Sequence, residues 1–506
     1  MATVLPPDSS IRVIQSTKKP LLKDYENLDQ LLVLLPSGAD ESAWSAVPRG
    51  ARLSRIARRR DASDDVPLVT SRLDNKAQTT VLVAMVASEA NAFERGTAAR
   101  RLAAAALAED PSRIAVLATG FPEEATAAMA RDQLLALLLA AFRLPVFRQK
   151  APKPRRLSTI RLVGLRERID ADRVQAEAAG NNLARWLTAL PPNVGDARAL
   201  RVAAAELAER HGWHYEFLDT TQLEDRGAGA FLAVARGNDN DDAGIVRLSW
   251  RPESAGEAPA VALVGKGIVF DTGGTNLKPA AGMLDMHGDM QGAAVALGSL
   301  LALTLLQAPF AVDCWLALTE NRTGPLAYKQ QDVVTAVNGK TIQVIHTDAE
   351  GRMVLADTLA LAGESGPGTI IDYATLTGTC ISALTSRYSG VFTNRPSLHP
   401  LLERAGEASG ERVWPFPVTD EFRDELKSEV ADLRQCLPAG AGDHIMAAAL
   451  LREFVPQQST WIHIDLSASS HEGGLAHAPT KVTGFGVRYT LGLLLDLAET
   501  PGRPGA

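Results

Sequence analysis

The feature of the sequence that most constrains the fold is a set of continuous apolar runs beyond residue 193. These runs lie at 261–264, 310–318, 369–374 and 461–466. The segments 289–306 and 352–362, which lie between runs, have the composition of helices. Unbroken apolar runs that alternate with helices are typical of parallel strands buried on both faces. We therefore predict an α/β fold in which a central, mostly parallel sheet is flanked by helices.

The first part of the chain predicts a second, smaller α/β domain. The chain has 506 residues, which is more than one hydrophobic core usually supports. Short apolar runs at 80–86 and 114–117 alternate with alanine-rich helical stretches, of which 125–142 is the most apolar. These runs and helices indicate a compact unit of their own.

A helical pattern at 170–190 separates the two units and is stopped by Pro191 and Pro192, because proline cannot continue a helix. We interpret it as a helix that joins the domains. The predicted division is an N-terminal α/β domain at 1–165, a linker helix at 166–192 and a catalytic domain at 193–506, so named for the residues described below.

Composition excludes several classes of protein. Apolar residues make up 46% and charged residues 22%, as in ordinary globular proteins, and the net charge of -7 gives no general attraction to nucleic acid. The three cysteines are too few and too widely spaced for a disulfide framework, which favours a reducing compartment. Residues 1–19 contain no apolar signal segment, and the apolar region 297–318 is broken by polar residues and a proline. We expect a cytoplasmic protein without a membrane span.

Acidic and basic residues gather in three segments of the catalytic domain, 265–278, 285–292 and 345–353. In open α/β sheets, ligands bind at the carboxyl ends of the strands, and these segments lie at or near such ends. Burying several carboxylates together is prohibitive unless cations neutralise them, and divalent metal ions are the simplest such cations. The residues concerned are Lys266, Asp271, Lys278, Asp289, Asp348, Glu350 and Arg352.

Each of these residues also has an ordinary structural interpretation. Lys266, flanked by glycines after an apolar run, fits a surface turn as well as a metal site, where burial would depress its pKa and a metal would keep it neutral. Lys278 fits a solvated loop. Asp289 fits a helix cap about as well as a ligand. Thr347 and Glu350 have the spacing of a capping box, Thr-x-x-Glu, ahead of the helix at 352–362.

The combination favours a hydrolytic centre with two metal ions. Two divalent ions about 3.5–4 Å apart can activate a water and polarise a carbonyl. Oxygen-rich ligand sets suit Mn²⁺, and zinc also accepts carboxylates, so both metals remain open. In such a centre Lys278 can face a developing oxyanion, and Arg352 can bind a small planar anion.

Four motifs in this order resemble the leucyl (cytosol) aminopeptidase family of dinuclear metallopeptidases. They are VGKGIVFDTGG at 264–274, DMQGA at 289–293, TDAEGR at 347–352 and ATLTG at 374–378. The resemblance covers roughly residues 175 to 490, and it implies an enzyme that hydrolyses the N-terminal peptide bond of peptides. The first third of the chain is assigned only by position.

The resemblance also implies roles for single residues. Lys266, Asp271, Asp289, Asp348 and Glu350 match the metal ligands, with Asp271 and Glu350 touching both ions. Lys278 matches a residue that polarises the carbonyl, and Arg352 one that holds a bicarbonate proton shuttle. The matching substrate-binding residues are Met286, Thr375, Leu376 and Gly378. A homohexamer is implied as well.

One departure from the family pattern affects the expected site: His346 stands where the family usually has asparagine. We expect His346 near the leaving-residue side of the substrate, where it either alters leaving-group preference or the pH profile, or acts as a neutral hydrogen-bonding substitute. Both interpretations stay open.

Two other functional classes compete with the aminopeptidase. The first is a catalytically inactive relative kept as a structural or binding protein. The presence of every expected metal ligand argues against it. The second is nucleic-acid binding, which we consider unlikely: its only support is a basic cluster that acidic residues follow at once. The cluster consists of Arg49, Arg52, Arg55, Arg58, Arg59 and Arg60.

Overall fold

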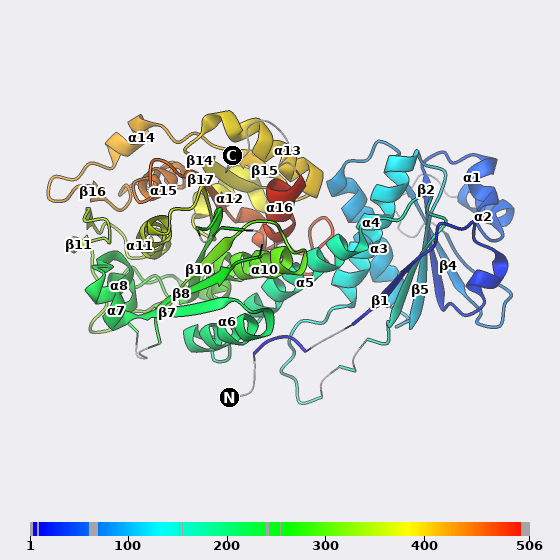
Figure 1. Ribbon diagram of the computed structural model, residues 1–506, viewed down its shortest axis with the longest axis horizontal. Helices are drawn as coiled ribbons and strands as arrows, with labels where there is room; N and C mark the ends of the chain where they lie inside the picture. Colours follow the sequence, from blue (N-terminus) through cyan, green and yellow to red (C-terminus); the bar gives the residue numbers. More distant parts are fainter. Residues whose placement is uncertain are drawn as a thin grey trace.

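The computed structural model contains two α/β bodies that lie side by side, each built around its own sheet (Figure 1). The structure describes residues 4–7, 10–59, 69–150, 152–153, 155–238, 242–253, 255–256 and 258–496. The predicted fold class is confirmed, since both sheets are mixed but mostly parallel and are packed against helices.

The first sheet has six strands in the order β1-β6-β5-β2-β4-β3, all parallel except β3. Its strands are β1 Arg12–Gln15, β2 Gln30–Pro36, β3 Val69–Arg72, β4 Thr80–Val86, β5 Arg113–Ala118 and β6 Thr159–Val163. Its helices are α1 Glu41–Ser45, α2 Gly50–Ala57, α3 Ala92–Leu107 and α4 Glu123–Ala141. The strands predicted at 80–86 and 114–117 and the helix predicted at 125–142 are therefore confirmed.

Both faces of this sheet are buried, as the unbroken apolar strands require. Along β2, Leu32 and Leu34 belong to the core that α3 and α4 cover, whereas Leu31, Val33 and Leu35 face a second core with Trp44 of α1 and Leu53 of α2. Alternate residues of a strand point to opposite faces, so one strand serves both cores.

Helix α5, Ala171–Thr188, joins the two bodies. Ala171, Val174 and Ala178 pack in the core of the first body, while Leu183 and Leu187 pack in the core of the second. A helix shared in this way fixes the two bodies against each other, as a predicted linker helix should. The exact domain limits at 165 and 192 stay a prediction.

The second sheet has eight strands in the order β15-β14-β17-β13-β9-β10-β8-β7. Its centre, β17-β13-β9-β10, is parallel, whereas β7, β8 and β14 run antiparallel to a neighbour. The strands are β7 His214–Asp219, β8 Gly244–Trp250, β9 Val261–Asp271, β10 Val312–Asn321, β13 Thr369–Ala374, β14 Ser389–Thr393, β15 Val413–Pro415 and β17 Thr460–Asp465. A small third sheet contains β11 Val333–Thr335, β12 Thr341–Gln343 and β16 Leu433–Arg434.

Helices cover both faces of the second sheet, which makes a three-layer arrangement (Figure 1). Helix α10, Gln291–Leu305, packs on one face together with α5, and helix α11, Glu350–Glu364, packs on the other. The remaining helices are α6 Ala197–His211, α7 Thr220–Asp225, α8 Gly229–Ala235, α9 Ala280–Met283, α12 Gly378–Leu384, α13 His399–Ser409, α14 Asp420–Glu425, α15 Asp443–Arg452 and α16 Val487–Leu491.

Within the part of the chain that the structure describes, one helical stretch, Ala280–Leu305, is long and apolar enough to cross a membrane, but 89% of its apolar window is buried inside the protein. The buried central helix of a globular domain has the same composition, so this single stretch is weak evidence for a span.

Candidate metal centre

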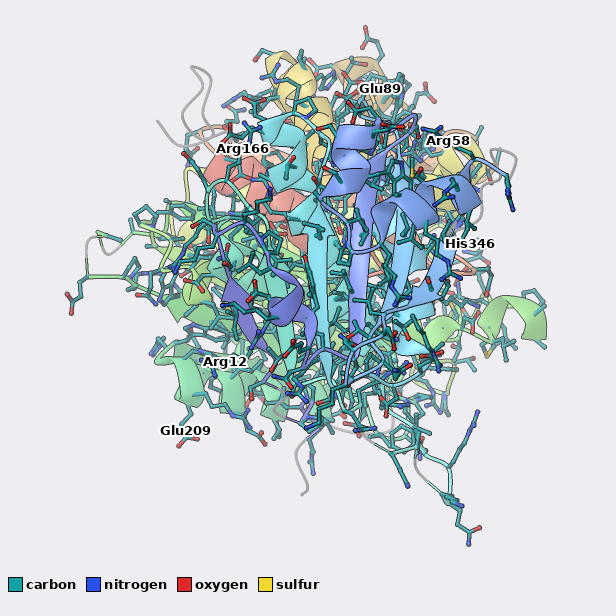
Figure 2. All side chains as sticks on the ribbon, turned by 90° about the vertical axis from the view of Figure 1, so that its right-hand side faces the viewer. Arg12, Arg58, Glu89, Arg166, Glu209 and His346 are labelled. Carbon is teal, nitrogen blue, oxygen red and sulfur yellow. The ribbon has the colours of Figure 1, made fainter. Side chains whose placement is uncertain are left out.

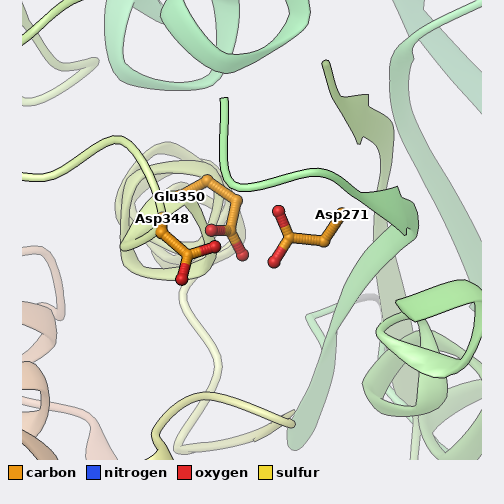
Figure 3. A group of neighbouring side chains, drawn as sticks. All are labelled: Asp271, Asp348 and Glu350. Carbon is orange, nitrogen blue, oxygen red and sulfur yellow. The ribbon is translucent and has the colours of Figure 1, made fainter. Parts of the chain in front are cut away.

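The three segments that carry the acidic residues meet at the carboxyl end of the central strands. Asp271 is the last residue of β9, Asp348 lies in the loop before α11, and Glu350 is the first residue of α11. One ligand oxygen from each of these three carboxylates lies within 4.8 Å of the others. Figure 3 shows the three side chains converging from the strand, the loop and the helix. The sequence prediction that distant acidic residues converge is confirmed for these three.

Lys266 lies inside a strand, so its interpretation as a residue of a surface turn is wrong. Strand β9 continues through both flanking glycines to Asp271, and the side chain of Lys266 is only 3% exposed. Its Nζ lies 2.7 Å from Asp289 Oδ2 and 2.9 Å from Glu350 Oε1. Gly351 leaves room for this side chain, because a Cβ there would come within 2.7 Å of Lys266 Cε.

Lys278 is held between two carboxylates rather than extended into solvent. Its Nζ lies 2.8 Å from Asp271 Oδ2 and 2.5 Å from Asp348 Oδ1, and its side chain is 17% exposed. The alternative interpretation of Lys278 as a solvated loop lysine is therefore wrong. An ammonium partly open to the site can reach a bound molecule without leaving its carboxylates.

Asp289 does not cap a helix. A 3-10 turn at Met286–Gly288 precedes it, and α10 begins only at Gln291, with Met290 at the N-cap. The Asp289 carboxylate instead accepts hydrogen bonds from Lys266 Nζ at 2.9 Å and from Thr375 Oγ1 at 2.6 Å. It is thereby placed beside Lys266.

The capping-box interpretation of Thr347 and Glu350 is also wrong. Helix α11 begins at Glu350 itself, and Ala349 stands at the N-cap. The hydroxyl of Thr347 accepts from the backbone N–H of Asn276 and donates to the carbonyl of Gly273, which ties the loop to the end of β9. Glu350 is left with its carboxylate facing Lys266.

Two residues that position the centre were missed from the sequence. Asn321, fully buried at the end of β10, donates from Nδ2 to Asp271 Oδ1 at 2.8 Å and to the Thr347 carbonyl at 3.0 Å. Its place at a strand end was a signal that could have been read. Gln435, also buried, accepts from the N–H groups of Ile345 and His346 and donates to the Ala349 carbonyl. No sequence pattern marked Gln435, because its partners are distant backbone groups.

The electrostatics of the metal-free centre are unfavourable for several of its anions. Burial, followed by the neighbouring carboxylates, raises the pKa of Asp271 well above its usual value, and burial also raises the pKa of Asp348. Burial raises the pKa of Asp289 to about 6 despite the adjacent Lys266 ammonium. Burial would raise the pKa of Glu350 too, but Lys266 and Lys278 lower it overall.

The same carboxylates act on Lys266 in the opposite sense to the prediction. Burial lowers its pKa, but Asp289, Glu350 and Asp271 raise it more, so the pKa lies above its usual value. The expected depression was wrong for the metal-free protein, because three anions surround the amine. Four crowded carboxylates and one amine are donors that divalent ions accept, and additional positive charge would relieve the repulsion. The residues present therefore fit a metal centre.

A cavity of about 480 Å³ opens over the centre. Its walls include all five predicted ligands, Lys278, and four of the predicted substrate-binding residues. Those four are Met286, Thr375, Leu376 and Gly378. Asp465 also lines the cavity; it accepts from the Leu376 N–H and the Thr377 hydroxyl and so fixes this wall.

His346 and Arg352 lie outside the described lining of that cavity. His346 is exposed at the surface, as Figure 2 shows, and its Nδ1 accepts a hydrogen bond from the Asp348 N–H at 3.2 Å. Its contact is thus with a predicted ligand's backbone.

Arg352 is almost completely buried, with 1% of its side chain exposed, and its guanidinium is already paired. Nη1 and Nη2 donate to Asp443 Oδ1 at 3.0 Å and Oδ2 at 2.6 Å, and Nη1 also donates to the Gln435 carbonyl. Two parallel bonds of this kind are the same arrangement that a planar anion would use.

The basic cluster lies on and beside α2, far along the chain from the centre. Arg49, Arg52, Arg55, Arg58 and Arg59 are exposed, and Figure 2 shows Arg58 at the surface. Arg60 lies outside the described residues. Arg49 pairs with Asp74 at 3.7 Å.

Sequence comparisons match this chain to one family. The model of the cytosol aminopeptidase family, catalytic domain, matches residues 182–491. A probable cytosol aminopeptidase of Synechococcus sp. is 36% identical over 93% of this chain and 97% of the relative. Another, of Parasynechococcus marenigrum, is 39% identical over 83% of this chain and 87% of the relative.

Solved structures agree with these matches. A tomato leucine aminopeptidase mutant superimposes with a TM-score of 0.82 at 27% identity and covers 96% of this chain and 97% of its own. The bottromycin maturation enzyme BotP in complex with Mn has a TM-score of 0.80 at 29% identity and covers 93% of this chain and 100% of its own.

Proposed function

The chain belongs to the cytosol aminopeptidase family and is a metallopeptidase of the aminopeptidase type, and on that premise we propose how its residues act on peptides. The observation that carries the proposal is the convergence of Asp271, Asp348 and Glu350 at the floor of a cavity. Carboxylates crowded in this way repel one another, and bound divalent ions would relieve that repulsion beyond what the two lysines supply.

We assign five ligands to two divalent ions, Zn²⁺ or Mn²⁺. Lys266 and Asp289 would serve one ion, Asp348 the other, and Asp271 and Glu350 would bridge both. The grouping is supported by the contacts of the two lysines: Lys266 lies against Asp289 and Glu350, and Lys278 lies between Asp271 and Asp348. The donor set suits zinc and manganese alike.

Bound ions of this kind activate a water molecule and polarise the scissile carbonyl. The protein's part is to hold the peptide's first residue and to stabilise the charge that develops on the carbonyl oxygen. Lys278 is the group for the second task, because it carries a positive charge, lines the cavity and is only partly exposed. A cation held in place before the reaction stabilises an oxyanion without reorganisation.

We do not propose that Arg352 holds bicarbonate. The family resemblance gave Arg352 such an ion, but the two terminal nitrogens that would face it donate to Asp443. The donors of Arg352 are therefore a poor fit for bicarbonate while that carboxylate is in place.

The cavity wall supports a pocket for the N-terminal residue. Met286, Leu376 and the backbone at Gly378 offer an apolar surface next to the proposed ions, and Thr375 donates to Asp289. Ions placed there would also bind the free α-amine, which would restrict the enzyme to the end of a peptide. Leucine, methionine and other apolar N-terminal residues are the substrates we propose.

His346 would act through Asp348 rather than through the substrate, since its contact is with the Asp348 N–H. Asparagine can accept the same bond from a residue two positions on. Comparing His346→Asn with the wild type across leaving groups tests this: equal rates support a substitute role, and a selective change supports a role at the leaving residue.

We also propose a cytoplasmic location, by similarity to relatives named cytosol aminopeptidase, and a homohexamer, which the resemblance of the sequence motifs implies. Size-exclusion chromatography with light scattering tests the assembly. Nucleic-acid binding is not proposed, because the only support is the exposed basic cluster on α2.

The decisive experiment assays aminoacyl amides with metal-stripped protein after separate additions of Zn²⁺, Mn²⁺ and Co²⁺. We expect release of the N-terminal residue only after metal is restored. Asp348→Ala should abolish turnover and Lys278→Ala should lower it by about 10²- to 10³-fold, while the assembly stays intact. Full activity of both variants would contradict the assignment, and an inactive wild type in all metals would favour the binding protein instead.

A further inference from the structure

The partner of Arg352 is a carboxylate that belongs to the protein. Asp443 presents both of its oxygens to the two terminal nitrogens of the guanidinium, at 3.0 Å and 2.6 Å. This is the bidentate geometry that arginine uses for carboxylates, phosphates and other planar oxyanions. The Nη1–Nη2 edge of the Arg352 guanidinium is therefore occupied by a carboxylate of the same protein.

The fold places Asp443 at this point by several independent contacts. It is the first residue of α15, after Gly442, whose φ of 61° turns the chain into the helix. The next residue, His444, is tied to Thr379 by two contacts of 3.0 Å, one from its N–H and one at Nδ1. A carboxylate at a helix N-terminus is also stabilised by the helix dipole. The position is thus built by the fold and does not depend on the ion pair alone.

The remaining donors of Arg352 have little access to an anion from solution, because only 1% of its side chain is exposed. Nη1 also donates a hydrogen bond to the Gln435 carbonyl at 3.2 Å. Nε has no hydrogen-bond partner among the described residues, but it has no access to solvent. An anion from solution can approach only where Asp443 now lies, since that side chain is 23% exposed whereas Arg352 is 1% exposed.

The ion pair is connected to the metal centre through the backbone. Arg352 lies in the first turn of α11, which begins at the predicted ligand Glu350. Gln435, whose carbonyl it contacts, holds the loop before that helix through Ile345, His346 and Ala349. Fixing Arg352 therefore helps to fix the segment that carries Asp348 and Glu350.

We propose that Asp443 is a built-in anion for Arg352, a positioning residue that takes the place of a bound small oxyanion and makes the enzyme independent of bicarbonate. Removing its carboxylate should create a site for a small planar oxyanion such as bicarbonate or formate. The part of this inference that concerns turnover rests on the proposed aminopeptidase function; the part that concerns anion binding does not.

The test uses metal-loaded, carbonate-depleted protein and four forms of it: wild type, Asp443→Ala, Asp443→Asn and Asp420→Ala. Asp420 is a matched control, because it is also the first residue of a helix and also pairs with an arginine, Arg452, at 3.1 Å, but it lies away from the centre. Sodium bicarbonate and sodium formate are titrated calorimetrically into each form, with sodium chloride as the salt control, and hydrolysis of leucine amide is assayed in parallel.

We expect binding of bicarbonate and formate to Asp443→Ala alone. Turnover of that variant should fall by about 10- to 100-fold, as for other residues that orient ligand-bearing segments, and should recover when either anion is added. Asp443→Asn should lose activity without recovery, because the amide fills the space. The control should match the wild type, whose rate the anions leave unchanged.

Binding of bicarbonate to the wild type, or stimulation of its rate, would overturn the proposal, as would an Asp443→Ala variant that binds neither anion. If no form hydrolyses leucine amide with any metal, the proposed function fails, and the calorimetric result still decides the proposal about Asp443.

Discussion

Lys266 Nζ lies 2.9 Å from Glu350 Oε1, and both side chains are at most 3% exposed. A buried ion pair at the floor of a cavity is costly to maintain, since the attraction must offset the loss of hydration of both groups. The pair also affects metal binding, because the Lys266 amine can bind a metal only after it has lost its proton. A metal ion that binds Lys266 must therefore displace the proton of its ammonium group.

Metal binding should therefore release protons. The pKa of Lys266 lies above its usual value, so its amine holds a proton that the metal-bound form cannot keep. Asp289, whose pKa is raised to about 6, holds a second such proton below that pH. We expect metal affinity to rise with pH. Calorimetric titration of Mn²⁺ into stripped protein in buffers of different ionisation enthalpy measures the proton count, and Lys266→Met should release about one proton fewer. Equal enthalpies in all buffers would refute this.

Replacement of Lys278 should impair turnover rather than substrate binding. Loss of one preorganised group that stabilises an oxyanion costs about 10²- to 10³-fold in kcat. We expect Lys278→Ala to show this loss in steady-state kinetics with leucine amide, with a small change in KM. Lys329→Ala is the control, since Lys329 is exposed and pairs with Asp332 at 3.5 Å. Equal kcat values for the two variants would argue against the role.

Gly292 should tolerate no side chain. It lies in the first turn of α10, where a Cβ would come within 2.1 Å of the Tyr373 carbonyl oxygen on β13. We expect Gly292→Ala to lower the free energy of unfolding by about 3 kcal/mol, as overpacking against backbone does. Gly256→Ala, at a position open for a Cβ, should leave the urea midpoint unchanged. Matching midpoints for the two variants would mean that α10 can shift away from the sheet.

Glu411 should make stability depend on pH. It is buried, and its Oε2 accepts from the N–H groups of Gly486 and Tyr489, yet burial raises its pKa to about 7. The neighbouring His477 supplies no charge, because burial lowers its pKa well below the usual value. A carboxyl whose folded pKa exceeds its unfolded value of 4.5 stabilises the fold below pH 4.5, and this contribution is lost as the pH rises through about 7.

The difference between wild type and Glu411→Gln measures this effect, since glutamine can still accept both hydrogen bonds. We expect equal stability near pH 4.5 and a variant more stable by about 3 kcal/mol above pH 7, at roughly 1.4 kcal/mol for each unit of pKa. Glu425→Gln, at an exposed position, supplies the background. A constant difference between pH 4.5 and 8 would contradict the assignment.

The sequence predicted the layers and the ligand cluster because both depend on local pattern. The mainly apolar run at 369–374 predicted β13 with its observed bounds, although Asp372 lies within it. Carboxylates at strand ends pointed to one edge of the sheet. The apolar run at 261–264 is shorter than the observed strand, Val261–Asp271. Lys266 and its flanking glycines interrupt the apolar pattern, although they remain in the sheet. Charged residues that a site requires are those that local pattern assigns to a surface.

Contacts between residues that are far apart in the sequence could not be predicted from local pattern. Asp443 lies well downstream of Arg352, and nothing in its own neighbourhood distinguishes it from an ordinary helix-starting aspartate. Gln435 acts on backbone groups, which every residue has. The alternative interpretation of Asp289 and Thr347 as helix caps failed for the same reason, because these side chains bond to tertiary partners instead of local backbone groups.

We propose that two divalent ions compensate the charge of the carboxylates and make the centre active. The most direct measurement is a titration of Mn²⁺ into metal-stripped protein while hydrolysis of leucine amide is followed at saturating substrate. We expect no turnover at the start and a plateau at two equivalents of metal per chain. Full turnover by protein that contains no metal would contradict it.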